Sequence, residues 1–260
     1  MRASTPTFAK LQCELKAPAS RIVLANPPLN VIDVPMMQEL IAALEEVQQR
    51  DDIAVVIFSG TGQSFSAGVD VKAHTPDKVR NMLVTFHSAL RSIANLKKVT
   101  IASVRGSCLG GGAELAALCD IVYTSESATW GFPEITLGCF PPVAAVVLSA
   151  IIGQKRAADL ILTGRTIGGR DAVAFGLANE AASDAQLDDL VNETVERLGA
   201  LSPAALAMTK KALYAWDSIH FEKGLDRAEK IYLEELMRTA DANEGVQAFM
   251  ERRQPKWTGK

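Results

Sequence analysis

The chain has 260 residues, with 27 Lys and Arg against 30 Asp and Glu, a formal net charge of −3, and 48% hydrophobic residues. This near-average composition is typical of a soluble globular protein and excludes a disordered or collagen-like chain. The balanced charge argues against nucleic acid as a partner, because such proteins cluster Lys and Arg on one face, and 3 histidines with 4 cysteines predict no metal site.

The cysteines are Cys13, Cys108, Cys119 and Cys139, and none forms a CxxC pair. No charged and then apolar leader opens the sequence, so we expect a cytoplasmic protein with reduced thiols. The longest apolar stretch, at 141–153, is shorter than the roughly 20 residues of a membrane-spanning helix. It predicts a buried segment and no membrane anchor.

The first half alternates between strand and helix patterns. Short runs rich in Val and Ile predict strands at 21–25 and 53–59, and between them the segment 36–50 carries apolar residues at helical spacing. Further strands are predicted at 100–104 and 121–124, separated by a glycine cluster and a short helix at 113–118. The alternation repeats without a hairpin signature.

The second half is mainly helical. Helices are predicted at 154–162, 185–201 and 203–216, with a short strand near 177–181. The segment KIYLEELMRTA at 230–240 has apolar spacing that suits packing on a partner or equally on its own core. We expect an α/β protein with a strand-rich core at 1–194 and a helical region at 195–260.

Two glycine-rich turns are candidate ligand sites, at 59–72 and 105–115. The first fails the dinucleotide-binding fingerprint because Phe65 occupies the third glycine position, and neither has the Gly-Lys-Ser/Thr of a P-loop. In the second, Gly110, Gly111 and Gly112 lead into a helix whose free N–H groups suit a developing oxyanion. A plain turn explains either segment equally well.

Two glutamates accompany these turns. Glu114 falls in the first turn of the predicted helix, where it could simply stabilise the helix dipole. Glu134 lies in the apolar stretch WGFPEITLG at 130–138, either as a solvated loop carboxylate or as a functional one. Together the glutamates and turns predict an acid/base pair facing an oxyanion hole.

These motifs resemble those of the enoyl-CoA hydratase/isomerase, or crotonase, superfamily. The likeness runs from NPPLNVID at 26–33 through FSAGVDVK at 65–72, GGGAELAALCD at 110–120 and FPEITLG at 132–138 to AFMERRQPKW at 248–257. The resemblance implies a spiral of repeated ββα units with a C-terminal helical trimerisation region, usually assembled as a trimer or a dimer of trimers.

The resemblance also implies the site residues. The oxyanion hole corresponds to the backbone N–H groups of Val69 and Gly111, and the catalytic carboxylates to Glu114 and Glu134. Positions implied to bind the coenzyme A part of the substrate are Ala67, Gly68, Lys72, Gly110, Phe249 and Arg252, the last two often from a neighbouring subunit. Lys72 and Arg252 are equally compatible with solvated charges. No cofactor beyond the coenzyme A thioester is implied.

In the implied reaction, water adds to a C=C bond conjugated with a thioester. Val69 and Gly111 would stabilise the enolate, one glutamate would take a proton from water, and Glu134 is expected to give one to the α-carbon. Asp70 is expected to stabilise its turn. The histidines, His74, His87 and His220, match no catalytic position and are expected on the surface or in the core.

One segment departs from the common pattern of the family. Where many hydratases have a glycine-rich turn, this chain has Phe140-Pro141-Pro142-Val143-Ala144-Ala145. Replacing glycines by Pro, Val and Ala stiffens the segment and fills space near the acyl pocket. This variant resembles the branch that hydrates cyclic dienoyl-CoA thioesters, such as cyclohexa-1,5-diene-1-carbonyl-CoA in anaerobic aromatic degradation.

Three alternatives remain at this stage. A short-chain enoyl-CoA hydratase would share every catalytic residue. An isomerase or decarboxylase of the same fold usually needs only one of the two carboxylates. A non-catalytic CoA-binding or RNA-binding member would keep the fold without needing the acidic pair, although the absence of a basic stripe argues against RNA.

Overall fold

A six-stranded sheet forms the centre of the computed structural model, which describes residues 8–215 and 217–259. Its strands, in spatial order, are β1 (Leu11–Lys16), β2 (Ala19–Leu24), β3 (Val55–Gly60), β5 (Val99–Val104), β7 (Ile121–Ser125) and β10 (Glu180–Ala182). Strand β1 pairs antiparallel with β2, and every later pair is parallel. A parallel sheet must be covered on both faces.

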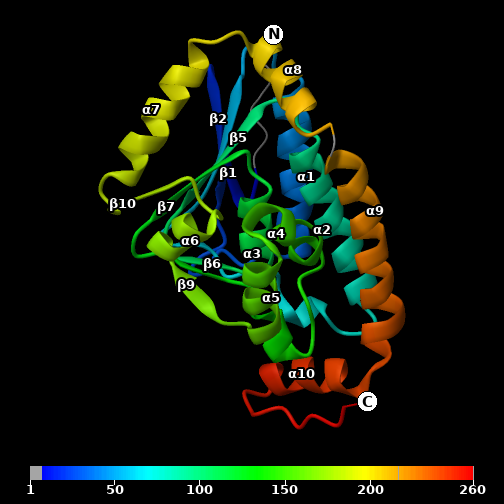
Figure 1. Ribbon diagram of the computed structural model, residues 1–260. Coiled ribbons are helices and arrows are strands. Elements are labelled where there is room, and N and C mark those ends of the chain that lie inside the picture. Colours follow the sequence, from blue (N-terminus) through cyan, green and yellow to red (C-terminus); the bar gives the residue numbers. More distant parts are fainter. Residues whose placement is uncertain (1–7, 216, 260) are drawn as a thin grey trace.

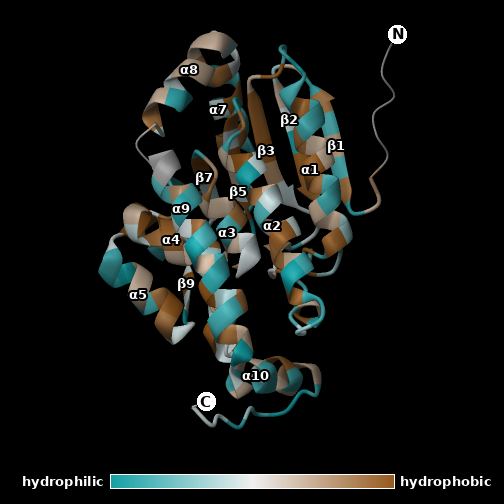
Figure 2. Cartoon of the chain, turned by 90° about the vertical axis from the view of Figure 1, so that its right-hand side faces the viewer, coloured by the Kyte–Doolittle hydropathy of each residue, from teal (hydrophilic) through white to brown (hydrophobic). Residues whose placement is uncertain are grey.

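Alternating residues of β3 show how both faces are buried. Val56 and Phe58 point into the main core, whereas Val55 and Ile57 join a second cluster on the opposite face. Helices α1 (Val34–Gln48) and α2 (Val79–Ala94) pack together beside the main core, and α7 (Leu187–Gly199) covers the second cluster. Figure 1 shows α1 and α2 on one side of the sheet and α7 on the other, and Figure 2 shows that the strands between them are largely hydrophobic.

A smaller sheet follows from a repeated unit. Three of the long strands are each followed by a short strand, and these short strands, β4 (Ser64–Ser66), β6 (Ser107–Leu109) and β8 (Thr129–Gly131), pair in parallel. Strand β9 (Thr166–Gly168) completes this sheet antiparallel to β8. Each short strand leads into a helical segment, η1 (Val71–Ala73), α3 (Gly111–Ala117) or η2 (Pro133–Leu137). This succession of strand, strand and helix is the expected ββα spiral.

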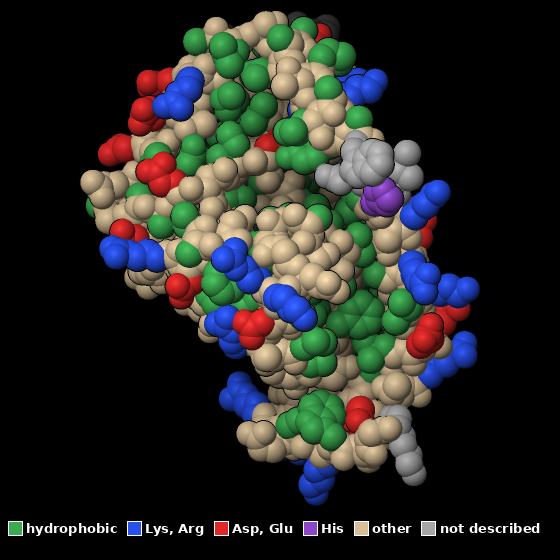
Figure 3. All heavy atoms as spheres, in the orientation of Figure 1, with side chains coloured by type: hydrophobic (Ala, Val, Ile, Leu, Met, Phe, Trp, Pro, Cys, Tyr) green, Lys and Arg blue, Asp and Glu red, His purple; other side chains and the backbone are tan. Residues whose placement is uncertain are grey.

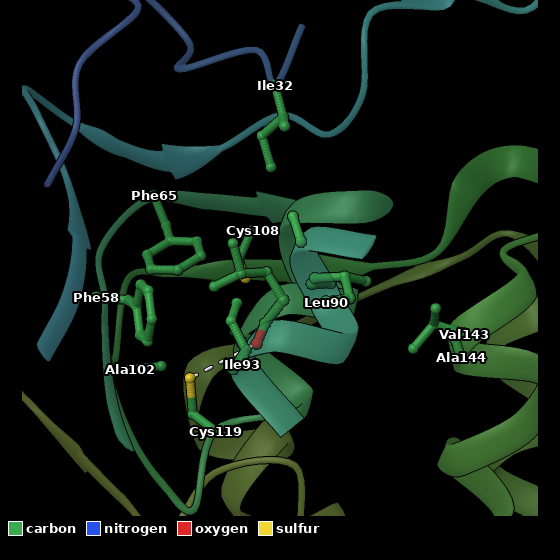
Figure 4. Packing of buried hydrophobic residues seen from close by; sticks show 14 of the residues in the cluster. Ile32, Phe58, Phe65, Leu90, Ile93, Ala102, Cys108, Cys119, Val143 and Ala144 are labelled. Carbon is green, nitrogen blue, oxygen red and sulfur yellow. Dashed lines mark hydrogen bonds between the residues drawn. The ribbon is translucent and has the colours of Figure 1, made fainter. Parts of the chain in front are cut away.

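Both sheets share a core. Figure 4 shows the rings of Phe58 and Phe65, from the long and short strands of one unit, close to Ala102 of β5. Beyond these strands, α4 (Pro142–Ile152) contributes Val143 and Ala144 to the same cluster. The short strands therefore end close to the main core, and this brings the segments that follow them together.

The remaining helices belong mainly to the C-terminal region. They are α5 (Gln154–Thr163), α6 (Gly169–Phe175), α8 (Pro203–Leu213), α9 (Asp217–Lys230), a single π-helical turn η3 (Ile231–Glu235), η4 (Leu236–Arg238) and α10 (Ala240–Met250). Helix α9 packs on α4, and α10 packs on η1 and η2. Both views place α10 with the C-terminus at one end of the molecule (Figures 1 and 2).

Most predicted elements occur close to their expected positions, with three differences. The helix predicted at 36–50 is α1 at Val34–Gln48, which begins earlier because Asp33 caps it and Pro35 occupies its first turn. Strand β1 was not predicted, and it forms a hairpin with β2 around Ala17 and Pro18. The strand predicted near 177–181 lies at Glu180–Ala182, where it pairs with β7.

The apolar stretch at 141–153 forms α4, which is buried along one side while Ile151 remains 40% exposed. The predicted boundary between 194 and 195 falls inside α7. Trp216, the last residue of the helix predicted at 203–216, lies outside the described residues; α8 ends at Leu213.

The described helices include none that is both long and apolar enough to span a bilayer. Over the face seen in Figure 3, basic and acidic side chains are interspersed rather than grouped by sign. All of the cysteines are free thiols.

Candidate active site

The two glycine-rich turns meet at the start of α3. A Cβ atom on Gly111 would lie 2.6 Å from Cγ2 of Val69, and one on Gly112 would lie 2.7 Å from Cβ of Ser66. Only glycine allows this approach, because real Cβ atoms do not come so close to carbon atoms of another segment. The segment after β4 is thereby packed directly against the N-terminus of α3.

This contact brings together the two predicted oxyanion donors. The N–H of Ile32 donates to the carbonyl of Gly68 (2.9 Å), and the N–H of Asp70 donates to the carbonyl of Ile32 (3.1 Å), a parallel bridge that does not use the N–H of Val69. The N–H of Gly111 belongs to the first residue of α3, where no intrahelical acceptor exists. Neither N–H donates to any group in the described ranges, and both residues line one cavity.

Glu114 lines the same cavity from the first turn of α3, and only 2% of its surface is exposed. Its Oε1 accepts hydrogen bonds from the N–H groups of Val143 (2.8 Å) and Ala144 (2.9 Å), in the first turn of α4. Burial raises the pKa of Glu114, and the two N–H donors and the nearby His87 offset this rise only in part. The donors favour the ionised carboxylate, since hydrogen bonds and a helix N-terminus both stabilise negative charge.

Glu134 reaches the same cavity from η2, which follows β8. Burial and then the negative charge of Glu114 raise the pKa of Glu134 to about 8. Its Oε2 is buried and has no hydrogen-bond partner within the described part of the chain. The site therefore pairs one carboxylate held by N–H donors with one that keeps its proton at neutral pH.

Gly110 sets how close Glu134 can come to the glycine turn. Its φ is +50°, in the region that favours glycine, and a Cβ atom there would lie 2.6 Å from Oε1 of Glu134. The N–H of Gly110 donates to the carbonyl of Gly131 at the end of β8 (2.9 Å). This bond ties the turn to the strand that leads to Glu134.

The cavity has a volume of about 80 Å³. It is lined by both glutamates, by Ala67, Gly68 and Val69 of the first turn and Gly110 and Gly111 of the second, and by apolar side chains of α2, η2 and the Phe140-Pro141-Pro142 segment. His74 and Tyr232 also line it. Neither was predicted as a site residue, because neither belongs to the motifs that carried the prediction.

The other residues predicted to bind coenzyme A lie outside this cavity. Lys72 is exposed on η1, where its N–H donates to Oδ1 of Asp70 (3.1 Å), so the expected turn-stabilising role of Asp70 is confirmed. Phe249 is 55% exposed on α10, and the exposed Arg252 follows the end of that helix. The structure thus brings α10 against η1 but places neither Phe249 nor Arg252 in the cavity lining.

The histidines differ in environment. His87 is fully buried on α2, and its Nδ1 lies 2.6 Å from Oε1 of Glu229 on α9. His220 is exposed, whereas His74 is half-buried with its Nδ1 3.2 Å from the carbonyl oxygen of Asp70. Burial lowers the pKa of His74, which favours a neutral ring beside the cavity.

Comparisons with known proteins agree with this arrangement. The family model described as enoyl-CoA hydratase/isomerase matches residues 15–260. The chain is 34% identical over 255 residues to the cyclohexa-1,5-dienecarbonyl-CoA hydratase of Thauera aromatica, covering 98% of each chain. It is 32% identical over 254 residues to a probable enoyl-CoA hydratase of Rhizobium meliloti, covering 96% of this chain and 98% of that one.

Solved structures show the same likeness. An enoyl-CoA hydratase from Mycobacterium avium subsp. paratuberculosis superimposes with a TM-score of 0.87 at 26% identity, over 97% of this chain and 100% of that one. An enoyl-CoA hydratase/isomerase from Xanthobacter autotrophicus also has a TM-score of 0.87, at 30% identity over 94% of each chain. The chain belongs to the enoyl-CoA hydratase/isomerase family.

Proposed function

We propose that this protein is a lyase that adds water to the conjugated double bond of an acyl-CoA thioester. One observation carries the proposal: two glutamates and two residues whose backbone N–H groups have no acceptor in the described part of the chain line one small cavity. A single-carboxylate isomerase or decarboxylase would not require the second buried glutamate, whose raised pKa costs folding free energy.

The N–H groups of Val69 and Gly111 would bind the thioester oxygen. Attack of water on the β-carbon moves the electrons of the C=C bond toward the carbonyl, and the oxygen becomes an enolate. Donors already aimed at that position stabilise the charge as it develops, and losing one donor typically costs about 3 kcal/mol of barrier.

The glutamates would divide the proton transfers. Glu114, whose Oε1 accepts hydrogen bonds from two N–H groups that favour its ionised form, takes one proton from water as the new C–O bond forms. Glu134, with its pKa near 8, gives one proton to the carbanionic carbon of the enolate. The net reaction adds one water molecule, and a proton must return from Glu114 to Glu134 before the next turnover.

The acyl group is proposed to be a cyclic diene. Support comes from the stiff Phe140-Pro141-Pro142 segment, which lines the cavity in place of a glycine-rich turn. The relative from Thauera aromatica, whose name specifies a cyclic dienoyl-CoA, gives further support. A flat ring suits a narrow cavity with apolar walls better than a flexible chain does, because less conformational entropy is lost on binding.

The test is a substrate panel. Crotonyl-CoA and cyclohexa-1,5-diene-1-carbonyl-CoA are compared by kcat/KM without added metal or nicotinamide. A preference for the cyclic thioester is expected, whereas a strong preference for crotonyl-CoA would make the protein a short-chain enoyl-CoA hydratase.

Variants test the mechanism independently of the substrate. Glu114→Gln and Glu134→Gln should each bind CoA thioesters and lose most hydration, by a factor of about 10² to 10⁴. Glu193→Gln is the matched control, because Glu193 is 69% exposed on α7 and pairs only with Arg197 in the described structure. Full activity in both active-site variants would refute the two-glutamate mechanism.

We further propose that the protein works as a trimer in which Phe249 and Arg252 complete the coenzyme A site of a neighbouring subunit. Met208, Leu213 and Phe249 support this proposal, because each exposes more than half of a large apolar side chain. Sedimentation analysis is expected to give a multiple of three chains. A monomer with full activity would refute it.

A further inference from the structure

Tyr232 enters the cavity from the C-terminal region. It lies in the single π-helical turn η3, directly after α9, and its side chain is 1% exposed. It lines the cavity together with Glu114, Glu134 and the glycine turns. Single π-helical turns occur frequently at functional sites, where they redirect one side chain of a helix.

The hydroxyl of Tyr232 is buried beside the Cys139 thiol. It makes no well-formed hydrogen bond to any group in the described ranges. Leaving a buried polar group unpaired costs about 1 to 3 kcal/mol, so such a group calls for an explanation. Tyr232 shares this property with Oε2 of Glu134, and both residues line the same cavity.

The surroundings keep the hydroxyl as a donor. Burial, the adjacent Cys139 thiol and then the charges of Glu134 and Glu114 raise the pKa of Tyr232 well above its ordinary value. The Cys139 thiol itself donates to the carbonyl of Leu137 (3.6 Å). Tyr232 therefore remains a neutral phenol at any pH at which the enzyme works, with its O–H available to a ligand.

Two sets of contacts position Tyr232, one to its ring and one to the helix that precedes it. The ring centroids of Phe140 and Tyr232 lie 5.2 Å apart, with an interplanar angle of 59°. Three residues earlier on α9, Glu229 lies 2.6 Å from Nδ1 of His87 and accepts from Nη1 of Arg91 (3.2 Å), which ties α9 to α2. The hydroxyl thus extends from a ring that packs on Phe140, in a helical segment that is bonded to α2.

We propose that the Tyr232 hydroxyl donates a hydrogen bond to the oxygen that is added to, or removed from, the acyl group. This inference rests on the proposed hydratase function and adds a third polar contact beside the two glutamates. In dehydration the departing oxygen gains negative charge, which an O–H donor stabilises, and by microscopic reversibility the same contact stabilises the transition state of hydration. The phenol ring would also form the wall of the cavity at the acyl group.

The first experiment compares two variants that each remove one buried tyrosine hydroxyl. Tyr232→Phe should lower kcat/KM about tenfold to hundredfold and leave Tm unchanged or higher, because within the described residues the hydroxyl has only its contact with the Cys139 thiol to lose. Tyr123→Phe is the control: Tyr123 on β7 bonds through its hydroxyl to Oγ1 of Thr194 (2.7 Å), away from the cavity. It should lower Tm by about 2 to 4 °C and leave kcat/KM unchanged.

The second experiment measures the contact directly. In the Glu114→Gln background, which slows turnover, two ligands are compared: 6-hydroxycyclohex-1-ene-1-carbonyl-CoA, which forms when hydroxide adds to the β-carbon and the dienolate takes its proton at the far ring carbon, and cyclohex-1-ene-1-carbonyl-CoA, which lacks the hydroxyl. Adding Tyr232→Phe should lower the affinity for the hydroxylated ligand about tenfold relative to the affinity for the ligand without the hydroxyl.

The outcomes separate the two proposals. An unchanged ratio of the two affinities would overturn the role of Tyr232, even if kcat/KM falls, because the tyrosine would then act only on packing. Equal kcat/KM in wild type and Tyr232→Phe would also overturn it while leaving the hydratase proposal intact. A wild-type protein that hydrates neither substrate of the panel would overturn both.

Discussion

The raised pKa of Glu134 predicts an alkaline limit to hydration. If Glu134 must be protonated to supply a proton to the enolate, kcat/KM should fall as pH rises through its pKa of about 8. One pH unit changes the ratio of protonated to ionised carboxyl tenfold. Glu134 would be protonated in roughly nine-tenths of the molecules at pH 7 and in roughly one-tenth at pH 9, so kcat/KM should drop by about a factor of ten.

The pKa values of three other titratable groups in or near the cavity, Cys139, Tyr232 and His74, are shifted away from this range. Burial raises the pKa of Cys139 to about 11 and that of Tyr232 well above its ordinary value, whereas burial lowers the pKa of His74. Glu114 is coupled to Glu134 by charge, so the limb near pH 8 reports the loss of the last proton of the pair.

The assay is kcat/KM of the wild-type protein between pH 5.5 and 10, with the better substrate of the panel and constant ionic strength. The alkaline limb should be absent from the residual activity of Glu134→Gln. A wild-type profile that stays flat up to pH 10 would refute the assignment. An alkaline limb that persists in Glu134→Gln would refute it as well.

Three further predictions concern stability and local geometry. Gly110→Ala should lower kcat more than Gly62→Ala does, because both glycines have positive φ but only the Cβ at 110 would meet Glu134, at 2.6 Å. Backbone strain should destabilise each variant by at least about 1 kcal/mol in urea denaturation. Asp120→Ala should destabilise the protein by about 3 to 5 kcal/mol in the same measurement, because it leaves the nearly buried Lys210 ammonium, 2.7 Å away, without its carboxylate. Above pH 8, Glu134→Gln should be more stable than the wild type. Because the pKa of Glu134 is about 8 in the folded protein and 4.5 in the unfolded chain, the free energy of unfolding of the wild type falls as pH rises between these values. At 1.36 kcal/mol per pKa unit, the difference is at most about 5 kcal/mol.

The sequence predicted best those parts of the site that lie in continuous motifs. Gly110 to Glu114 occupy one turn and the first turn of one helix, so their spacing alone determines their relative positions. Glu134 was found by a different signal, a carboxylate among apolar residues in a Gly- and Pro-rich stretch. Periodicity likewise located β3 and α1, because each buries a face with a regular repeat.

Contacts that depend on the tertiary fold could not be predicted in this way. Tyr232 lies almost a hundred residues beyond Glu134, and nothing local to KIYLEELMRTA indicates that its tyrosine enters the cavity. The same holds for α2, which was not predicted although it supplies Phe86 to the cavity and His87 to the region beside Glu114. Apolar spacing in these helices shows that one face is buried but not against which partner.

The two glutamates have the same side chain, so their surroundings must account for the different roles proposed for them. Both are buried, and burial alone would raise both pKa values. The start of α4 breaks the symmetry, because its two N–H groups reach Glu114 and none reaches Oε2 of Glu134 among the described groups. Pro142 is the first residue of α4 and has no N–H group. The first free N–H groups of the helix are therefore those of Val143 and Ala144, and both donate to Glu114. In the proposed mechanism, the segment that lines the cavity beside the acyl group would thus also determine which glutamate acts as the base.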